Sequence, residues 1–194
     1  MFFREMIAAY GLANAVEART FGDISKDNLQ TYLELLTQKA VFKERVKRVG
    51  IIRDAEVSTA TAAFQSVQAA LRDAQLPVPA AMNALEGNPL AVGVFILPDC
   101  QTAGMLESLC LSAVAEIEKA QPEAVLPCVD EFFACLNKRG RKASNPTKAQ
   151  FAGYALAYDV IDPQLGRAAQ KGAIPWGVKA FDPLKAFLKN ISGL

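Results

Sequence analysis

The sequence predicts an α/β fold with a mostly parallel sheet flanked by helices and followed by a helical C-terminal part. Two β-branched apolar runs, residues 48–53 and 91–97, alternate with helical patterns through the first 118 residues, as in βαβ units. The second run is apolar on both faces, which is typical of a central parallel strand. We therefore expect an α/β core over residues 1–118 and a helical extension over residues 119–194, packed on the same domain.

The spacing of apolar residues, and the residues that begin or end helices, predict the elements before the first run. Residues 2–10 carry apolar side chains on one helical face, and Gly11 ends that helix. Residues 16–21 alternate between apolar and polar, as a half-buried strand would. Ser25 can cap the next helix. The predicted inner face of that helix consists of Leu29, Tyr32, Leu33 and Leu36.

Between and after the two runs, the pattern predicts helices and one long connection. A helix from about Ser58 keeps three- and four-residue apolar spacing up to Pro77. Residues 76–90 are rich in Pro, Asn and Gly, and such stretches often form functional loops or contain an edge element. A turn after the run 91–97 leads into a helix near Gly104.

Proline marks the starts of three helices in the C-terminal part. Pro127 fits the first position of one helix. The pairs Asn145-Pro146 and Asp182-Pro183 place a capping side chain before a proline, the usual signature of a helix start.

The amino-acid composition limits which catalytic groups and metal ligands this chain can supply. A chain of 194 residues with 52% hydrophobic and 21% charged residues suits one globular domain. It has no histidine, which excludes histidine-dependent catalytic triads and histidine-ligated zinc. Its four cysteines form no CxxC pair, so we expect reduced thiols rather than disulfides. Carboxylates are the remaining metal ligands, and they favour Mg²⁺ or Mn²⁺.

Charge and hydropathy bear on location and partners. No apolar run approaches the ~20 residues that span a bilayer, and the N-terminus does not read as a signal peptide. We expect a cytoplasmic protein without a membrane partner. Residues 138–142, Lys-Arg-Gly-Arg-Lys, are either a solvated loop or a phosphate-contacting patch.

Four carboxylates follow the two predicted strands. Asp54 and Glu56 come after the first, Asp99 after the second, and Glu107 lies in the first turn of the next helix. Strand carboxyl ends form the ligand crevice of open α/β sheets, so the cluster predicts a site for a hard cation. Each residue also has a structural alternative: Asp54 as a helix cap, Glu56 as a solvated residue, Asp99 as the start of a turn, and Glu107 as a charge favoured by the helix dipole.

Residues 49–56 resemble the hydrophobic strand and D-x-D segment of Toprim domains, with glutamate as the second acid. Leu97-Pro98-Asp99 followed by Gly104-Met105-Leu106-Glu107 resembles a segment of a small, uncharacterised Toprim-like family related to the nuclease domain of OLD (overcoming lysogenization defect) proteins. The resemblance covers roughly residues 2–160 and implies Mg²⁺ or Mn²⁺ held by Asp54, Glu56, Asp99 and Glu107. It further implies catalytic roles for Glu107 and for Lys148, the best match to the later lysine of OLD-type sites.

Toprim proteins open with a strand that ends in Glu-Gly, whereas this sequence begins inside the helix that follows it. We expect the first strand and its glutamate to be absent. The resemblance then leaves three functions open. The first is a metal-dependent phosphodiesterase or nuclease acting on nucleic acid. The second is a catalytically silent module that binds nucleic acid or protein, and the third is a small-nucleotide phosphatase. A sheet edge exposed by the missing strand would also favour self-association.

Overall fold

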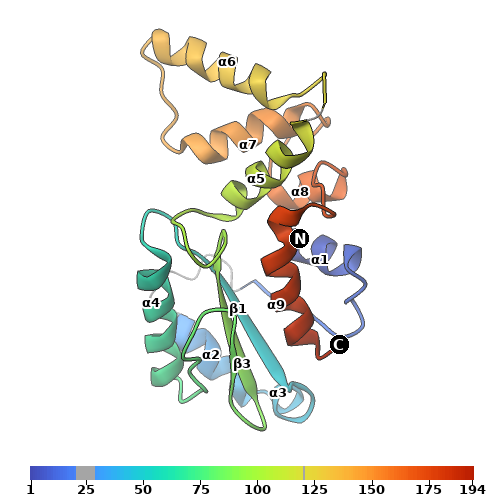
Figure 1. The fold of residues 1–194 in the computed structure, drawn as a ribbon. Coiled ribbons are helices and arrows are strands. Elements are labelled where there is room, and N and C mark those ends of the chain that lie inside the picture. Colours follow the sequence, from blue (N-terminus) through green and yellow to red (C-terminus); the bar gives the residue numbers. More distant parts are fainter. Residues whose placement is uncertain (21–28, 120) are drawn as a thin grey trace. The chain divides into compact units, whose positions relative to one another are not determined.

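The computed structural model describes residues 1–20, 29–119 and 121–194 and is a mixed α/β structure. The chain divides into two compact units (Figure 1). The helical unit consists of Met1–Ala13 and Leu106–Asp182, and the sheet unit of Asn14–Met105 and Pro183–Leu194. Each unit joins segments that are distant in the sequence, so the division does not follow the expected boundary at residue 118.

Among its described residues, the sheet unit contains three strands in the order β1-β3-β2. Strands β1 (Arg48–Asp54) and β3 (Ala91–Leu97) are parallel, whereas β2 (Leu85–Glu86) pairs antiparallel with β3. The expectation of a mostly parallel sheet is therefore corrected to a small mixed one. The reason is the short connection of residues 87–90, because parallel strands need a much longer crossover. The predicted edge element within residues 76–90 is β2, and β1 lies at the other end of this order.

Helices cover both faces of this sheet (Figure 1). On one face, α2 (Leu29–Gln38) and α4 (Ala60–Asp73) share a buried cluster with alternate residues of β3, namely Val92, Val94 and Ile96. On the other face lies α9 (Asp182–Ser192), whose Phe187 ring contacts Phe95 of β3 at a centroid distance of 5.5 Å. A helix α3 (Ala40–Arg45) precedes β1.

Two strand glycines explain how closely α9 approaches the sheet. A Cβ atom at Gly93 would lie 3.0 Å from Cε2 of Phe187, and one at Gly50 would lie 2.9 Å from Cγ1 of Ile191. A larger residue at either position would push the helix away, so the glycines are required here for packing rather than for backbone freedom.

The helical unit is built from six helices in the part of the chain that the structure describes. They are α1 (Phe2–Ala9), α5 (Leu106–Glu118), α6 (Leu126–Lys138), α7 (Pro146–Leu156), α8 (Leu165–Gln170) and the 3₁₀ helix η2 (Lys179–Phe181). Its core includes the fully buried Phe151, Tyr154 and Phe181. The Tyr154 hydroxyl donates to the carbonyl oxygen of Ala173, 3.2 Å away.

Two carboxylates of α5 accept hydrogen bonds from backbone N–H groups at the starts of later helices. The side chain of Glu118, which is buried, accepts from the backbone N–H groups of Val125 and Leu126, both at 2.9 Å. That of Glu116 accepts from Lys179 and Ala180 at 3.1 and 3.0 Å. The first N–H groups of a helix have no partner within it, so both side chains act as distant caps.

Most predicted elements are confirmed, including the strands at residues 48–53 and 91–97 and the cap at Asn145, whose Oδ1 accepts from Lys148 N–H at 3.0 Å. The helix expected from about Ser58 is α4, which begins at Ala60 and is capped by Thr59. Residues 16–20 form no strand, so that prediction is wrong; Phe21 and Ser25 lie outside the described residues. None of the described helices has the length and hydropathy required to cross a bilayer.

Candidate functional site

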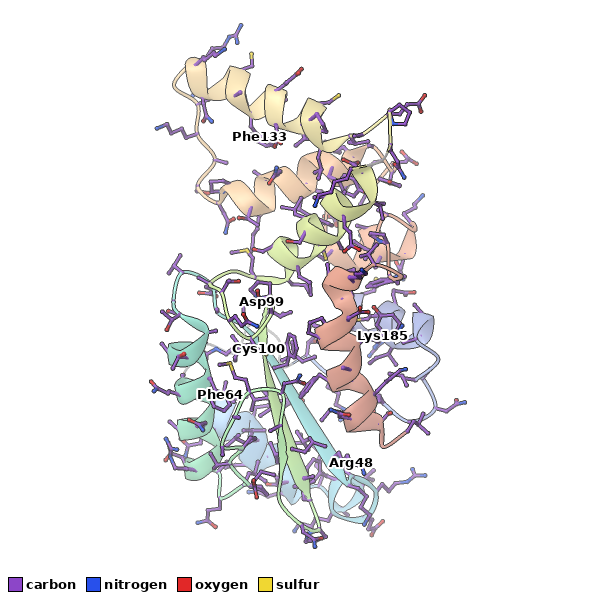
Figure 2. The ribbon with its side chains drawn as sticks, viewed as in Figure 1. Arg48, Phe64, Asp99, Cys100, Phe133 and Lys185 are labelled. Carbon is purple, nitrogen blue, oxygen red and sulfur yellow. The ribbon has the colours of Figure 1, made fainter. Side chains whose placement is uncertain are left out.

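The parallel register brings two of the predicted acidic segments to one end of the sheet. Asp54 lies opposite Leu97, so the loop after β1 and the loop after β3 leave neighbouring strands at the same level. Figure 2 shows Asp99 and Cys100 together at the carboxyl end of β3, with Arg48 at the opposite end of the sheet. This is the edge where ligands bind in open α/β sheets.

Backbone hydrogen bonds join the two loops. The N–H of Ala55 donates to the carbonyl oxygen of Leu97 at 3.1 Å, and that of Glu56 donates to Gly104 at 2.6 Å. Residues 56 and 104 form an isolated antiparallel bridge. The position of Glu56 is therefore set by the loop after β3 as well as by its own strand.

Both loops hold a non-glycine residue in the left-handed backbone region. Glu56 has φ 56° and Cys100 has φ 64°. Such residues cost free energy and persist where surrounding contacts fix them, often at functional sites. Cys100 is fixed by two bonds to one neighbour: its N–H donates to the carbonyl of Ile96 at 2.7 Å, and its Sγ accepts from Ile96 N–H at 3.4 Å.

The Cys100 thiol is not suited to nucleophilic chemistry. Partial burial raises its pKa, the hydrogen bond from Ile96 acts in the other direction, and the negative charge of Asp99 raises it further. The net result is a pKa above the ordinary value, so the group stays protonated near neutral pH. We assign Cys100 to the loop structure.

Asp99 organises its own loop. Its Oδ1 accepts from the N–H groups of Gln101 and Thr102, at 2.9 and 2.8 Å, and from the Thr102 hydroxyl at 3.0 Å. Desolvation is the largest single influence on this carboxyl and raises its pKa, but the bonds from Thr102 and Gln101 together outweigh it and lower the pKa. The structural alternative for this residue, the start of a turn, is what the geometry shows.

Asp54 and Glu56 are the remaining carboxylates at this edge, and both are half-buried. Their oxygens suit a hard cation, and Mg²⁺ commonly binds one or two carboxylates while keeping several waters. No group of three or more potential metal ligands occurs within residues 1–20, 29–119 and 121–194. A magnesium or manganese ion at Asp54 and Glu56 stays a prediction.

The other two predicted residues belong to the helical unit. Glu107 is half-buried in the first turn of α5, and its charge raises the pKa of the buried Cys110, although burial is the larger cause. Lys148 is exposed in the first turn of α7. The metal and catalytic roles that the resemblance implies for Glu107, and the catalytic role for Lys148, stay predictions.

Sequence reasoning missed the residues that shape these loops. Thr102 and Gly104 hold the loop after β3 and its contact with Glu56. The spacing Asp-x-x-Thr at positions 99–102 carries a signal for such a turn, since aspartate side chains often bond backbone two or three residues ahead. No local pattern marks the pairing of Gly104 with Glu56.

Comparison with known proteins identifies a family. The chain matches, over residues 1–193, the family described as "Protein of unknown function (DUF3226)". The chain belongs to this family. No curated protein and no solved structure matches it. The DUF3226 description carries no activity, so any function must be argued from the residues at the carboxyl edge of the sheet and from the surface of the helical unit.

Proposed function

We propose that the sheet unit is a Toprim-like domain that binds Mg²⁺ or Mn²⁺ and hydrolyses phosphodiester bonds of nucleic acid. One observation carries the proposal. The parallel pairing of Asp54 with Leu97 sets the acidic ends of β1 and β3 side by side, and the two loops are bonded to each other through Glu56 and Gly104.

The residues have distinct roles in this proposal. Asp54 and Glu56 hold the cation, and Asp99 keeps the loop after β3 in the shape that meets Glu56. A bound divalent cation supplies the charge that polarises a phosphate oxygen and lowers the pKa of its water. The half-buried position of both carboxylates limits competing water, which strengthens their attraction for a cation.

A second candidate is a binding module without catalysis. The observation that favours it is the engagement of Asp99, whose Oδ1 already accepts three hydrogen bonds from its own loop. The carboxylate of Asp99 is then less available to a cation than the resemblance implies. A module of this kind would have the same fold and bind its partner without catalysing a reaction.

Cleavage of single-stranded DNA, duplex DNA and RNA, with Mg²⁺, Mn²⁺ or a chelator, separates the two candidates. The proposal predicts cation-dependent cleavage that Asp54→Asn or Glu56→Gln lowers by about two orders of magnitude or more, the usual scale for losing transition-state charge stabilisation. Asp73→Asn, an exposed acid at the end of α4, is the matched control and should retain the rate.

Cleavage that persists in both site variants would overturn the metal site. Absence of cleavage together with tight binding of any of the three substrates would support the silent module instead. The two site variants must match the wild type in thermal unfolding, so that a lost rate reports the site and not the fold.

A further inference from the structure

Five exposed cations gather at the turn between α6 and α7. This cluster, the basic hairpin, consists of Lys138, Arg139, Arg141, Lys142 and Lys148. The segment from residue 138 to residue 148 contains no aspartate or glutamate, in a chain whose net charge is only +1. The charge is therefore local, which is the form that a phosphate-binding surface takes.

The turn has a defined geometry. Helix α6 ends at Lys138, and Gly140, two residues later, has a φ of 72°, in the left-handed region that favours glycine. The N–H of Gly140 donates to Asn137, and that of Arg141 donates to Leu136, both at 3.0 Å. Asn145 then caps α7. Hydrogen bonds therefore hold both helix ends at this turn.

The two helices are also packed against each other. A Cβ atom at Gly153 of α7 would lie 2.8 Å from Cγ1 of Val129, which is buried. This close approach fixes the base of the hairpin. The basic residues thus project from a supported structure rather than from a free loop.

Only some of these positive charges stabilise the helices on which they lie. Lys138 and Arg139 lie at the C-terminus of α6, where cations are favourable, and an Arg139 N–H bonds the carbonyl oxygen of Cys135. Arg141, Lys142 and Lys148 precede or begin α7, where the dipole disfavours positive charge. Among the ion pairs of the described residues, none includes a member of the basic hairpin.

A second basic segment provides a comparison within the same chain. Five cations are also exposed before and at the start of β1, namely Lys39, Lys43, Arg45, Lys47 and Arg48. Glu44 lies among them, so their charge is partly offset. Attraction for a polyanion grows with the number of adjacent uncompensated cations, and the basic hairpin has more of them.

We propose that the basic hairpin binds the phosphodiester backbone of a nucleic acid and does so without reading base sequence. Lysine and arginine on a protruding turn offer phosphate contacts, which position a nucleic acid but carry no sequence information. The choice of nucleic acid over another polyanion rests on the proposed function. The binding itself involves only the helical unit and requires no cation.

Fluorescence anisotropy with a labelled duplex and with one of its strands, in chelator, tests this inference. If all five cations contact phosphates, duplex affinity falls about 500-fold between about 50 and 200 mM salt, from a log–log slope near −4.5. Replacing Lys138, Arg139, Arg141 and Lys142 by Gln should make the slope shallower by about 3 to 4. Whichever probe binds tighter identifies the strandedness.

The matched control replaces Lys39, Lys43, Arg45 and Lys47 by Gln, which removes the same charge from the sheet unit. We expect its slope to change by less than about 1. Equal losses in both quadruple variants would overturn the inference, because binding would then follow net charge alone. A double variant, Arg141→Gln with Lys142→Gln, leaves the Arg139 contact in place and should lose about half of the effect.

Two further comparisons in the binding experiment distinguish a failure of this inference from a failure of the proposed function. Asp54→Asn should bind as the wild type does in chelator, whatever its effect on cleavage. If the hairpin variant binds normally, the basic hairpin is excluded while the metal site can still stand. Competition by poly-glutamate as effective as that by DNA would overturn the assignment to nucleic acid.

Discussion

The sheet unit and the helical unit use carboxylates in different ways. In the helical unit, Glu116 and Glu118 project from α5 and accept backbone N–H groups from segments far along the chain. In the sheet unit, Asp99 does the same within its own loop, whereas the proposal assigns Asp54 and Glu56, both at the end of β1, to a cation. An acid at a strand end can therefore serve its own loop as readily as a ligand.

The largest expected effect concerns the core of the sheet unit. Phe95 is fully buried against Phe187, so Phe95→Ala should lower the free energy of unfolding by about 3–5 kcal/mol. Phe132, which is 58% exposed on α6, is the matched control in the helical unit. Phe132→Ala should cost less than about 1 kcal/mol. Urea unfolding followed by circular dichroism measures both, and similar losses would contradict the burial described here.

A smaller loss is expected from the buried cap in the helical unit. Glu118→Gln retains one acceptor for the N–H groups of Val125 and Leu126 and introduces an amide in place of the charge. We expect a loss of about 1–3 kcal/mol, the scale for leaving a buried donor without its partner. Glu123→Gln, an exposed acid nearby, is the control and should be nearly neutral in the same urea experiment.

The smallest of these stability effects concerns Asp99. Its folded pKa is lowered, so its stabilisation is present above the unfolded pKa of about 3.9 and disappears as pH falls through the folded value. Asp99→Asn should cost less than about 1 kcal/mol at neutral pH, since solvent screens the group. The difference from the wild type should shrink as the pH falls below the unfolded pKa and the carboxyl becomes protonated. A difference that stays constant as the pH falls from 7 into the acid range would contradict the assigned hydrogen bonds.

Much of the fold follows from sequence patterns because those patterns are local. The strand at residues 91–97 is apolar at every position, and the cap at Asn145 is one residue from Pro146. The mixed sheet could not be predicted, because β2 is only two residues long and is defined by its pairing with Gly93. The same is true of the two units, since α9 joins the sheet through contacts with segments more than 80 residues earlier in the chain.

The candidate site also has a part that the sequence predicts and a part that it does not. Asp54, Glu56 and Asp99 were predicted to lie at one edge, and the β1–β3 register places the ends of their strands together there. The role of Asp99 depended on the direction of three donors, which the sequence suggests only weakly. Glu107 was connected to the site by its place in the helix after the second strand as well as by resemblance, and Lys148 by resemblance alone; both lie in the helical unit.

Calorimetric titration with Mn²⁺ tests the central comparison most directly. We expect weak binding by the wild type, because such ions keep most of their waters without a phosphate ligand. Asp54→Asn and Glu56→Gln should abolish the heat of binding, whereas Asp99→Asn, once shown to be folded, should retain measurable binding. Identical heats for the wild type and Asp54→Asn would contradict the metal site, and loss of binding in Asp99→Asn as complete as in Asp54→Asn would contradict the distinction between them.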